Sequence, residues 1–393
     1  MSFYDSVRRA APQLSLITFM VFLSMYARVL LSPLLVYLQT DLALSTAEAT
    51  RLFLPLAVSY SGTMLVSGFV ARALGHRRTI SLSALVIGSG LLLVSLGSGL
   101  PALYLAYAII GAGAGLYPPS GVASVTAMVH DRIRGKAIAI HEVGPNSAFV
   151  ISPILVAVAI PFLGWRGIAA ASGVVALVMA VVFDRASVAG GFRPERPHGG
   201  NLGAILRQPE FWAVTVFFSW AASSTIGVFA ILPTFLIGTE GFDATMINTL
   251  ISLSRVSGIA MVFMSGYLVD RYGARRTMGA VLSVTGALTA LIGMLHGNAM
   301  LVVVFLQPMI ISAFFPAAIS AIADLGPPAM RSVAVSFMIP MVNLVANGFF
   351  PSLMGALAER DLIRYGFVGL GIVMLLSLLM LPMIRNHRIA DPA

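Results

Sequence analysis

Cysteine is absent from the 393-residue chain, so neither a disulfide, nor a thiol nucleophile, nor a cysteine-ligated metal can form. Charged residues are also scarce: they make up 10% of the chain, against about a quarter in a typical soluble domain. Hydrophobic residues reach 58%, and the mean hydropathy is +0.94. So few charges cannot cover the surface of a water-soluble fold of this length. The composition therefore predicts a protein whose surface faces the lipid bilayer.

Other missing features narrow the function. The net charge of +9 comes from basic residues scattered between apolar runs, which argues against a nucleic-acid partner. No Gly-x-x-x-x-Gly-Lys-Ser/Thr loop exists, so this chain alone is not an ATP-driven pump. No nucleophile–base pair and no metal-ligand spacing are visible, so we expect no enzyme, no metal and no cofactor. Residues 1–13 lack the cleavage site of a signal peptide, and the first apolar run is long enough to remain a membrane span.

Twelve apolar stretches approach the length of about 20 residues that a membrane span requires. They lie near 14–38, 49–71, 79–98, 101–129, 137–163, 166–183, 211–236, 246–269, 277–295, 299–323, 332–357 and 362–384. The longest polar stretch, 184–210, divides them six and six. The sequence therefore predicts an all-α membrane protein: an N-terminal six-helix bundle over 1–183, a cytoplasmic linker over 184–210, and a C-terminal six-helix bundle over 211–393.

Basic residues are distributed unevenly between the two sides of these spans. With the N-terminus inside, the cytoplasmic segments hold 18 of the 24 basic residues. The opposite side holds four, and two more fall inside spans. Loops rich in Arg and Lys stay in the cytoplasm, so we expect a multi-pass protein of the cytoplasmic (inner) membrane with both termini inside. The four on the opposite side are Arg51, Arg166, Arg360 and Arg364.

The chain contains an internal repeat. Residues 67–80 read SGFVARALGHRRTI and residues 265–278 read SGYLVDRYGARRTM, with six of fourteen positions identical. Each segment joins the second and third spans of its half. Such a repeat is typical of transporters built from two related bundles.

These paired loops resemble the signature of the major facilitator superfamily, Gly-x-x-x-Asp-x-x-Gly-x-[x]-Arg-Arg, in which the bracketed position is optional. The second copy matches closely, whereas the first has Arg72 where the family usually has Asp. The resemblance implies two six-helix bundles with pseudo-two-fold symmetry, a central cavity between them, and alternating access by rocking. It assigns a gating role to Gly68, Arg77, Arg78, Gly266, Asp270, Arg275 and Arg276.

Arg28 and Arg255 lie inside predicted spans, where a charged side chain is costly and is by default a functional candidate. A guanidinium offers a planar fork of donors that matches a carboxylate, so both arginines are candidates for binding an anionic substrate. Alternatively, Arg28 could snorkel toward the outer face, or one of the two arginines could bond carbonyls at a helix end. Monocarboxylate and oxalate-type members of the superfamily carry a substrate-binding arginine in the eighth span. Arg255 matches that placement, and its counterpart in the first repeat is Ala57.

Glu142 and His141 are the candidate proton-coupling residues. A carboxylate or an imidazole held away from bulk water can exchange a proton near neutral pH. The alternative is a contact of Glu142 with cytoplasmic arginines. Four further polar residues could hydrogen-bond the substrate or, equally, join neighbouring helices: Tyr117, Asn146, Gln307 and Asn343.

The sequence thus favours a monomeric, proton-coupled symporter of a small organic anion, with a carboxylate as the expected cargo. The alternative is a multidrug, siderophore or vitamin transporter of the same fold. Exporters of the superfamily usually carry a Gly-rich signature that ends in Gly-Pro within the fifth span. Here Gly144-Pro145 comes early in that span, which counts against drug export.

Overall fold

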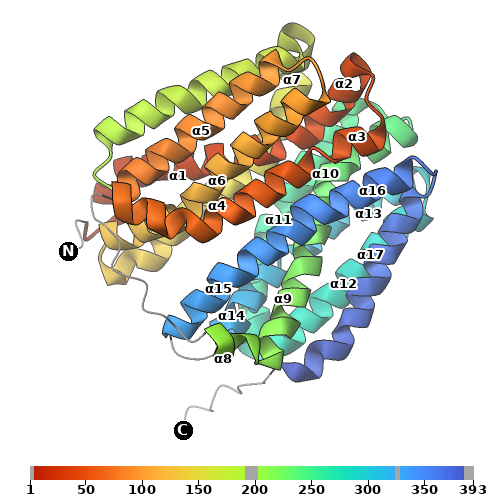
Figure 1. Ribbon diagram of the computed structural model, residues 1–393. Coiled ribbons are helices and arrows are strands. Elements are labelled where there is room, and N and C mark those ends of the chain that lie inside the picture. Colours follow the sequence, from red (N-terminus) through yellow and green to blue (C-terminus); the bar gives the residue numbers. More distant parts are fainter. Residues whose placement is uncertain (1–3, 191–201, 324–327, 385–393) are drawn as a thin grey trace. The chain divides into compact units, whose positions relative to one another are not determined.

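The computed structural model describes residues 4–190, 202–323 and 328–384 (Figure 1). Over these residues the regular secondary structure is helical, apart from one isolated bridge between Tyr4 and Val129. The chain divides into two compact units, Met1–Arg196 and Pro197–Ala393, and each is described separately below.

Within residues 4–190, the N-terminal unit contains seven helices. They are α1 (Val7–Val29), α2 (Leu31–Leu42), α3 (Thr46–Thr50), α4 (Phe53–Leu74), α5 (His76–Leu96), α6 (Leu100–Met128) and α7 (Asp131–Ala186). Helices α1 and α2 adjoin at Leu30, and together they form the first membrane pass.

Helix α7 doubles back on itself. Thr18 on α1 donates a hydrogen bond to the carbonyl of Ile140, and Gln13 on α1 donates one to the carbonyl of Ala186. A straight helix would separate Ile140 from Ala186 by about 69 Å, at 1.5 Å per residue, whereas their two partners are five residues apart. The reversal lies at Gly164, whose backbone (φ 61°, ψ 175°) is not helical. Residues 131–186 therefore form two passes, as the predicted spans 137–163 and 166–183 require.

The C-terminal unit contains ten α-helical segments, three π-helices and a 3₁₀ segment in the part of the chain that is described. In order they are α8 (Leu202–Leu206), α9 (Pro209–Ala222), η1 (Ser223–Gly227), α10 (Val228–Pro233), η2 (Thr234–Thr239), α11 (Ala244–Tyr272), α12 (Ala274–Met294), α13 (Gly297–Ile311), α14 (Phe314–Ala323), α15 (Pro328–Asn343), η3 (Leu344–Phe349), α16 (Phe350–Ala358), α17 (Ile363–Ser377) and η4 (Leu378–Met383). Segments α9 to η2 form one continuous pass, Pro209–Thr239.

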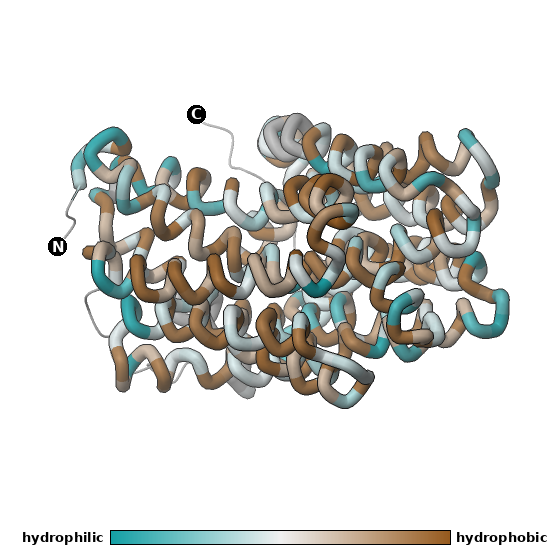
Figure 2. The backbone as a smooth tube through the Cα atoms, turned by 90° about the horizontal axis from the view of Figure 1, so that it is seen from above, coloured by the Kyte–Doolittle hydropathy of each residue, from teal (hydrophilic) through white to brown (hydrophobic). Residues whose placement is uncertain are grey.

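Ten continuous stretches of the described residues are long and apolar enough to cross a membrane. One of them, the α7 stretch, is two passes because of the reversal at Gly164. Helix α11 is not among the ten, but its 29 residues are enough to cross a membrane and add one further pass. The ten stretches, the additional pass within α7 and helix α11 give twelve passes. The predicted all-α, twelve-span fold is therefore confirmed. Figure 2 shows hydrophobic residues along the helices and hydrophilic residues at many of the turns.

Corresponding residues of the two units cap corresponding helices at an offset of 198. Ser45 accepts a hydrogen bond from the backbone N–H of Glu48, and Asp243 accepts one from that of Met246. Both are N-cap contacts, which satisfy amide groups that the first helical turn leaves without intrahelical partners. The two units are therefore repeats in local detail as well as in span order.

Candidate functional site

Arg255 is held within the C-terminal unit by the pass that contains η1. It lies in the middle of α11, half-buried, and its Nη2 donates a 2.6 Å hydrogen bond to the carbonyl of Thr225 in η1. Its Cζ lies 5.1 Å from the ring centroid of Phe229. A guanidinium carries five N–H donors in one plane, and the fork that bonds a carbonyl also suits a carboxylate or phosphate oxygen.

The π-helix η1 receives a second side-chain donor. Gln307 on α13 is buried, and its Nε2 donates to the Ser224 carbonyl at 2.9 Å and also to the Ser224 hydroxyl. The same nitrogen is 3.4 Å from Oγ1 of Thr289 on α12. A π-helix bonds i to i+5 and occurs mostly as a single turn, often at functional sites. Two consecutive carbonyls of η1 thus accept bonds from α11 and α13, so Gln307 joins three helices.

Asn343 lies next to a second π-helix, η3. Its Oδ1 accepts a 2.8 Å hydrogen bond from Nδ2 of Asn347, one turn further on. The two π-helices cross closely: a Cβ added to Gly227 would lie 2.8 Å from the carbonyl oxygen of Ala346. The structure therefore brings Arg255 and Gln307 to η1, and places η3, which Asn343 precedes, against the same turn.

Arg28 lies on the face of an aromatic ring in the N-terminal unit. Its Cζ is 4.0 Å from the ring centroid of Tyr60, a buried residue of α4. Such a cation–π contact stabilises a partly desolvated guanidinium by about 1–2 kcal/mol. The ring of Tyr60 thus helps to hold Arg28 inside the unit.

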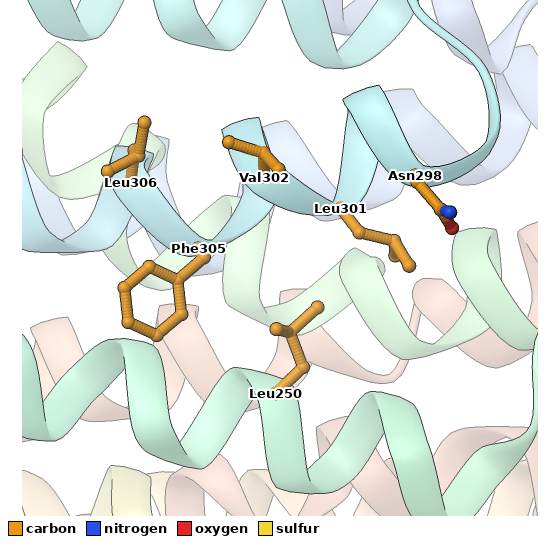
Figure 3. Close-up of a pocket in the computed structure, with 6 residues that line it drawn as sticks. All are labelled: Leu250, Asn298, Leu301, Val302, Phe305 and Leu306. Atoms are coloured by element: carbon orange, nitrogen blue, oxygen red, sulfur yellow. The ribbon is translucent and has the colours of Figure 1, made fainter.

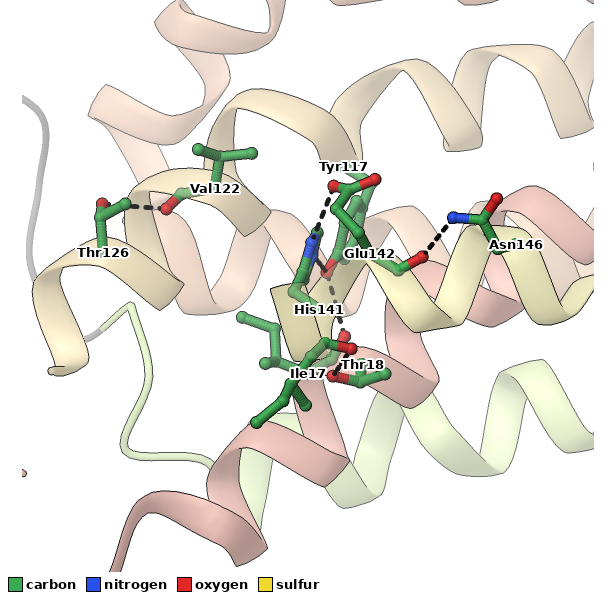
Figure 4. A network of polar contacts seen from close by, with 9 residues as sticks. Ile17, Thr18, Tyr117, Val122, Thr126, His141, Glu142 and Asn146 are labelled. Atoms are coloured by element: carbon green, nitrogen blue, oxygen red, sulfur yellow. Dashed lines mark hydrogen bonds and ion pairs between the residues drawn. The ribbon is translucent and has the colours of Figure 1, made fainter. Parts of the chain in front are cut away.

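Tyr117, His141 and Glu142 form a chain of polar contacts in the N-terminal unit (Figure 4). The buried Tyr117 hydroxyl donates to the carbonyl of Ile17 at 3.0 Å and lies 2.9 Å from Nε2 of His141. Nδ1 of His141 lies 3.4 Å from Oε1 of Glu142. His141 is buried, whereas 56% of the Glu142 side chain is exposed. The contacts thus run from the inside of the unit to its surface.

This arrangement determines where protons can reside. The single hydroxyl proton of Tyr117 goes to the Ile17 carbonyl, so Nε2 of His141 must donate to the Tyr117 oxygen. With its proton on Nε2, a neutral His141 presents a lone pair at Nδ1 to Glu142. A hydrogen bond between Nδ1 and Oε1 then requires one further proton, carried by either residue.

Asn146 is exposed on α7, one turn after Glu142 (Figure 4). Its Nδ2 donates a 2.8 Å hydrogen bond to the carbonyl of Glu142, four residues earlier on α7. The side chain is thus engaged with its own helix backbone.

The residues predicted to act in gating show the same geometry in both copies. Gly75 and Gly273 end their helices with nearly the same backbone angles, φ 84° and ψ 155° against φ 82° and ψ 157°. Only glycine adopts this region without strain. The first arginine of each copy, Arg77 or Arg275, is half-buried, and the second, Arg78 or Arg276, is exposed. Gly68 on α4 and Gly266 on α11 are also exposed.

In the first copy of the loop signature, Arg72 stands where the family usually has Asp, and a different acidic residue, Asp184, lies near the signature arginine Arg77. Nε of Arg77 lies 3.7 Å from Oδ1 of Asp184 near the end of α7. The backbone N–H of Arg77 also donates to the carbonyl of Gly190 at 2.9 Å. In the first repeat, an acidic residue that is distant in sequence thus pairs with the signature arginine. In the second repeat, Asp270 is exposed on α11.

An apolar groove of about 380 Å³ lies between α11 and α13 in the C-terminal unit (Figure 3). Its lining is Leu250, Asn298, Leu301, Val302, Phe305 and Leu306. None of these side chains is charged, so the groove does not provide the counter-charge that an anion requires. Within the described residues, no three His, Asp or Glu side chains gather in a way that could hold a metal ion.

Sequence reasoning did not identify the partners that hold the two arginines. Thr225 contributes a backbone carbonyl, which no side-chain pattern reveals, and Tyr60 and Phe229 resemble ordinary apolar residues of a span. Asp184 carried a usable signal, because it is the one acidic residue near the end of the sixth predicted span.

Twelve membrane passes in two repeated units, with charged side chains within the passes, define a membrane carrier. The sequence matches the Major Facilitator Superfamily over residues 17–264 and 241–392, and the chain belongs to this family. Membership makes it a secondary transporter and not an enzyme.

Individual relatives are distant. A "Probable hexose phosphate transport protein" of Chlamydia trachomatis serovar D is 22% identical over 290 residues, covering 65% of this chain and 63% of that protein. A bacterial homologue of the human lysosomal transporter Spinster, inward-facing and occupied, superposes with a TM-score of 0.82 at 14% identity, covering 97% of each chain. A D-xylose-proton symporter gives 0.77 at 15% identity, covering 97% of this chain and 99% of that one. At these identities the structural matches establish the fold alone.

Proposed function

We propose that this transporter moves a small organic anion and that Arg255 is its main anion-binding group. The observation that carries the proposal is the position of Arg255, half-buried in the middle of a membrane helix and oriented by the Thr225 carbonyl and the Phe229 ring. Placing a guanidinium there is costly, and it is justified by an anionic ligand. Arg28, held on Tyr60, is the second candidate.

Two classes of anion fit a guanidinium fork. A carboxylate is favoured by the resemblance of Arg255 to the eighth-span arginine of monocarboxylate-type members. A phosphate monoester is favoured by the hexose phosphate transport protein that is 22% identical over 290 residues. Both classes present two oxygens to two N–H donors of the guanidinium. Transport measurements with substrates of each class distinguish a carboxylate from a phosphate monoester.

The proposal includes proton coupling at the His141–Glu142 pair. One proton bridges these residues, and the exposed carboxylate of Glu142 gives that proton a path to water. Loss of the proton would leave a carboxylate facing the lone pair of Nδ1, which weakens the contact between the two side chains. Binding and release of one proton thereby change the packing of α7 against Tyr117.

The test is uptake into proteoliposomes by the Arg255→Ala and Arg255→Lys variants, with labelled monocarboxylates, dicarboxylates and hexose phosphates as substrates. We expect Arg255→Ala to lower kcat/KM at least about tenfold for the transported anion, since a charge-assisted hydrogen bond contributes about 1.5–3 kcal/mol. Arg255→Lys keeps the charge but lacks the fork, so we expect intermediate activity.

Arg360→Ala is the matched control, because Arg360 is exposed in the loop before α17. It should transport as the unchanged chain does. Undiminished anion uptake by Arg255→Ala would remove Arg255 from the site. Uptake of lipophilic cations in place of anions would favour the multidrug alternative.

A further inference from the structure

Arg364 ties three passes of the C-terminal unit together at one end. From the first turn of α17 its Nη2 donates to Oε1 of Glu240 at 2.6 Å and to Nδ1 of His296 at 2.8 Å. Its Nη1 donates to the carbonyls of Leu295 at 2.8 Å and Gly293 at 3.3 Å, at the end of α12. Glu240 directly follows η2. One guanidinium thus joins α17, the end of α12 and the end of the pass that contains η1.

Arg166 makes the corresponding contacts in the N-terminal unit. Its Nη1 pairs with Oδ2 of Asp41 near the end of α2, and its Nη2 donates to the carbonyl of Gly97 after α5 at 3.4 Å. Its Cζ stacks 4.1 Å over the ring of Trp165, whose Nε1 donates to the same Asp41 oxygen at 3.2 Å. Here too one guanidinium joins three passes at one end of the unit.

The two clusters are related by the internal repeat. Arg166 and Arg364 stand 198 positions apart, and so do Gly97 and Leu295, whose carbonyls accept the hydrogen bonds. The acidic partners Asp41 and Glu240 differ by 199 positions. Each precedes a residue with a left-handed backbone, Ala43 (φ 50°) and Gly241 (φ 76°), again 198 apart. The arginine donor, the carbonyl acceptor and the left-handed turn therefore occupy corresponding positions, so the same arrangement occurs once in each unit.

We infer that Arg166 and Arg364 are two copies of one clamp that positions the ends of three passes in each unit, and that protonation of His296 releases the second copy alone. The second clamp also bears on the proposed anion site. Glu240 lies at the end of the continuous pass whose Thr225 carbonyl orients Arg255, so the clamp fixes the register of that pass.

The pH dependence follows from the geometry at His296. Nδ1 can accept from Arg364 only while it carries no proton, and a protonated imidazole would place a second positive charge 2.8 Å from the guanidinium. Histidine is the side chain that changes charge between pH 5 and 8. The charged groups in contact at this point are Arg364 from α17 and Glu240 after η2, and Arg360 and Asp361 are exposed in the loop before α17.

The first clamp has no histidine, because Ser98 occupies the position that corresponds to His296. It is also more exposed. The side chains of Arg166 and Asp41 are 43% and 47% exposed, against 23% and 13% for Arg364 and Glu240. Water can therefore replace lost contacts in the first clamp, whereas the more buried second clamp loses more when one member is removed.

The absence of native cysteine allows a direct measurement with paired spin labels in the full-length chain, reconstituted in lipid. One pair, Thr239→Cys with Met294→Cys, spans the second clamp. The other, Thr40→Cys with Leu96→Cys, spans the first at corresponding, exposed positions. We expect a second, longer distance population for the C-terminal pair at pH 5 that is absent at pH 8. The N-terminal pair should show one population at both values.

His296→Gln keeps an acceptor oxygen without a titratable proton, so it should abolish the pH effect on the C-terminal pair. Arg364→Gln should give the longer population at both pH values. A C-terminal pair that is unaffected by pH, an equal response of both pairs, or a pH response that survives in His296→Gln would each overturn the inference. The measurement requires no substrate, so its outcome is independent of the proposed function.

Discussion

At the residue scale, the two arginines within membrane spans are held by different means. Arg255 is oriented by a backbone carbonyl at 2.6 Å, whereas Arg28 lies on the ring of Tyr60. The carbonyl fixes one N–H of Arg255 and therefore the direction of its fork, and the ring stacks against the guanidinium of Arg28. The bond to Thr225 thus orients Arg255 for binding oxygens in a defined geometry.

Glu142 allows a test of proton coupling at the same scale. Glu142→Gln removes the titratable carboxylate but keeps the shape and a hydrogen-bonding oxygen for His141. We expect the variant to lose accumulation driven by a pH gradient while retaining substrate exchange, which needs no net proton movement. The measurement is uptake with an imposed pH gradient, compared with counterflow in its absence.

Asp361→Asn is the control for Glu142→Gln. It also neutralises one carboxylate, but in an exposed turn where the backbone (φ 57°) is tolerated by Asn. It should keep both activities. Retained pH-driven accumulation in Glu142→Gln would exclude this residue from coupling.

The sequence identified the candidate residues better than their surroundings. Arg255 and Glu142 stand out because a charge is rare inside an apolar span. Tyr117 and Gln307 carried no such signal: the structure shows that their polar atoms bond the backbone of neighbouring helices, at Ile17 and Ser224. That distinction depends on which helices adjoin, which one sequence does not reveal.

At the element scale, Gly164 makes α7 two passes instead of one. Its backbone (φ 61°, ψ 175°) lies in a region that is essentially restricted to glycine. A Cβ there would meet no atom within 4 Å, so substitution acts through the backbone alone. We expect Gly164→Ala to lower the free energy of unfolding by about 1–3 kcal/mol, measured by denaturation of the purified protein.

Gly135→Ala in the same element is the comparison. Gly135 is helical and exposed, and a Cβ there also meets no atom within 4 Å. Alanine favours a helix over glycine by about 1 kcal/mol, so this variant should be at least as stable as the unchanged chain. Equal stability of the two variants would contradict the role assigned to Gly164.

At the scale of the whole molecule, orientation in the membrane is a prediction from charge. The cytoplasmic assignment rests on 18 basic residues against four. In the cysteine-free chain, a membrane-impermeant maleimide should label Leu163→Cys in intact cells, because the charge distribution predicts that the α7 reversal, where Leu163 lies, faces the outer side. Lys136→Cys, near the start of α7, should be labelled only after the membrane is permeabilised. Both positions are exposed, so the reverse pattern would mean the opposite topology.

The sequence by itself determined the membrane environment, the twelve spans, the repeat and the family, because hydropathy and local motifs depend on residues that are close together in the chain. The linker expected over 184–210 stays a prediction; helix α7 extends to Ala186, and residues 191–201 lie outside the described part of the chain. Only the tertiary structure decided which groups meet. Arg255 and Thr225 are 30 residues apart, Tyr117 and Ile17 are 100 apart, and Arg364 and Glu240 are 124 apart. Such pairs form because packed helices bring distant backbone and side-chain atoms together, and no pattern along the chain records that.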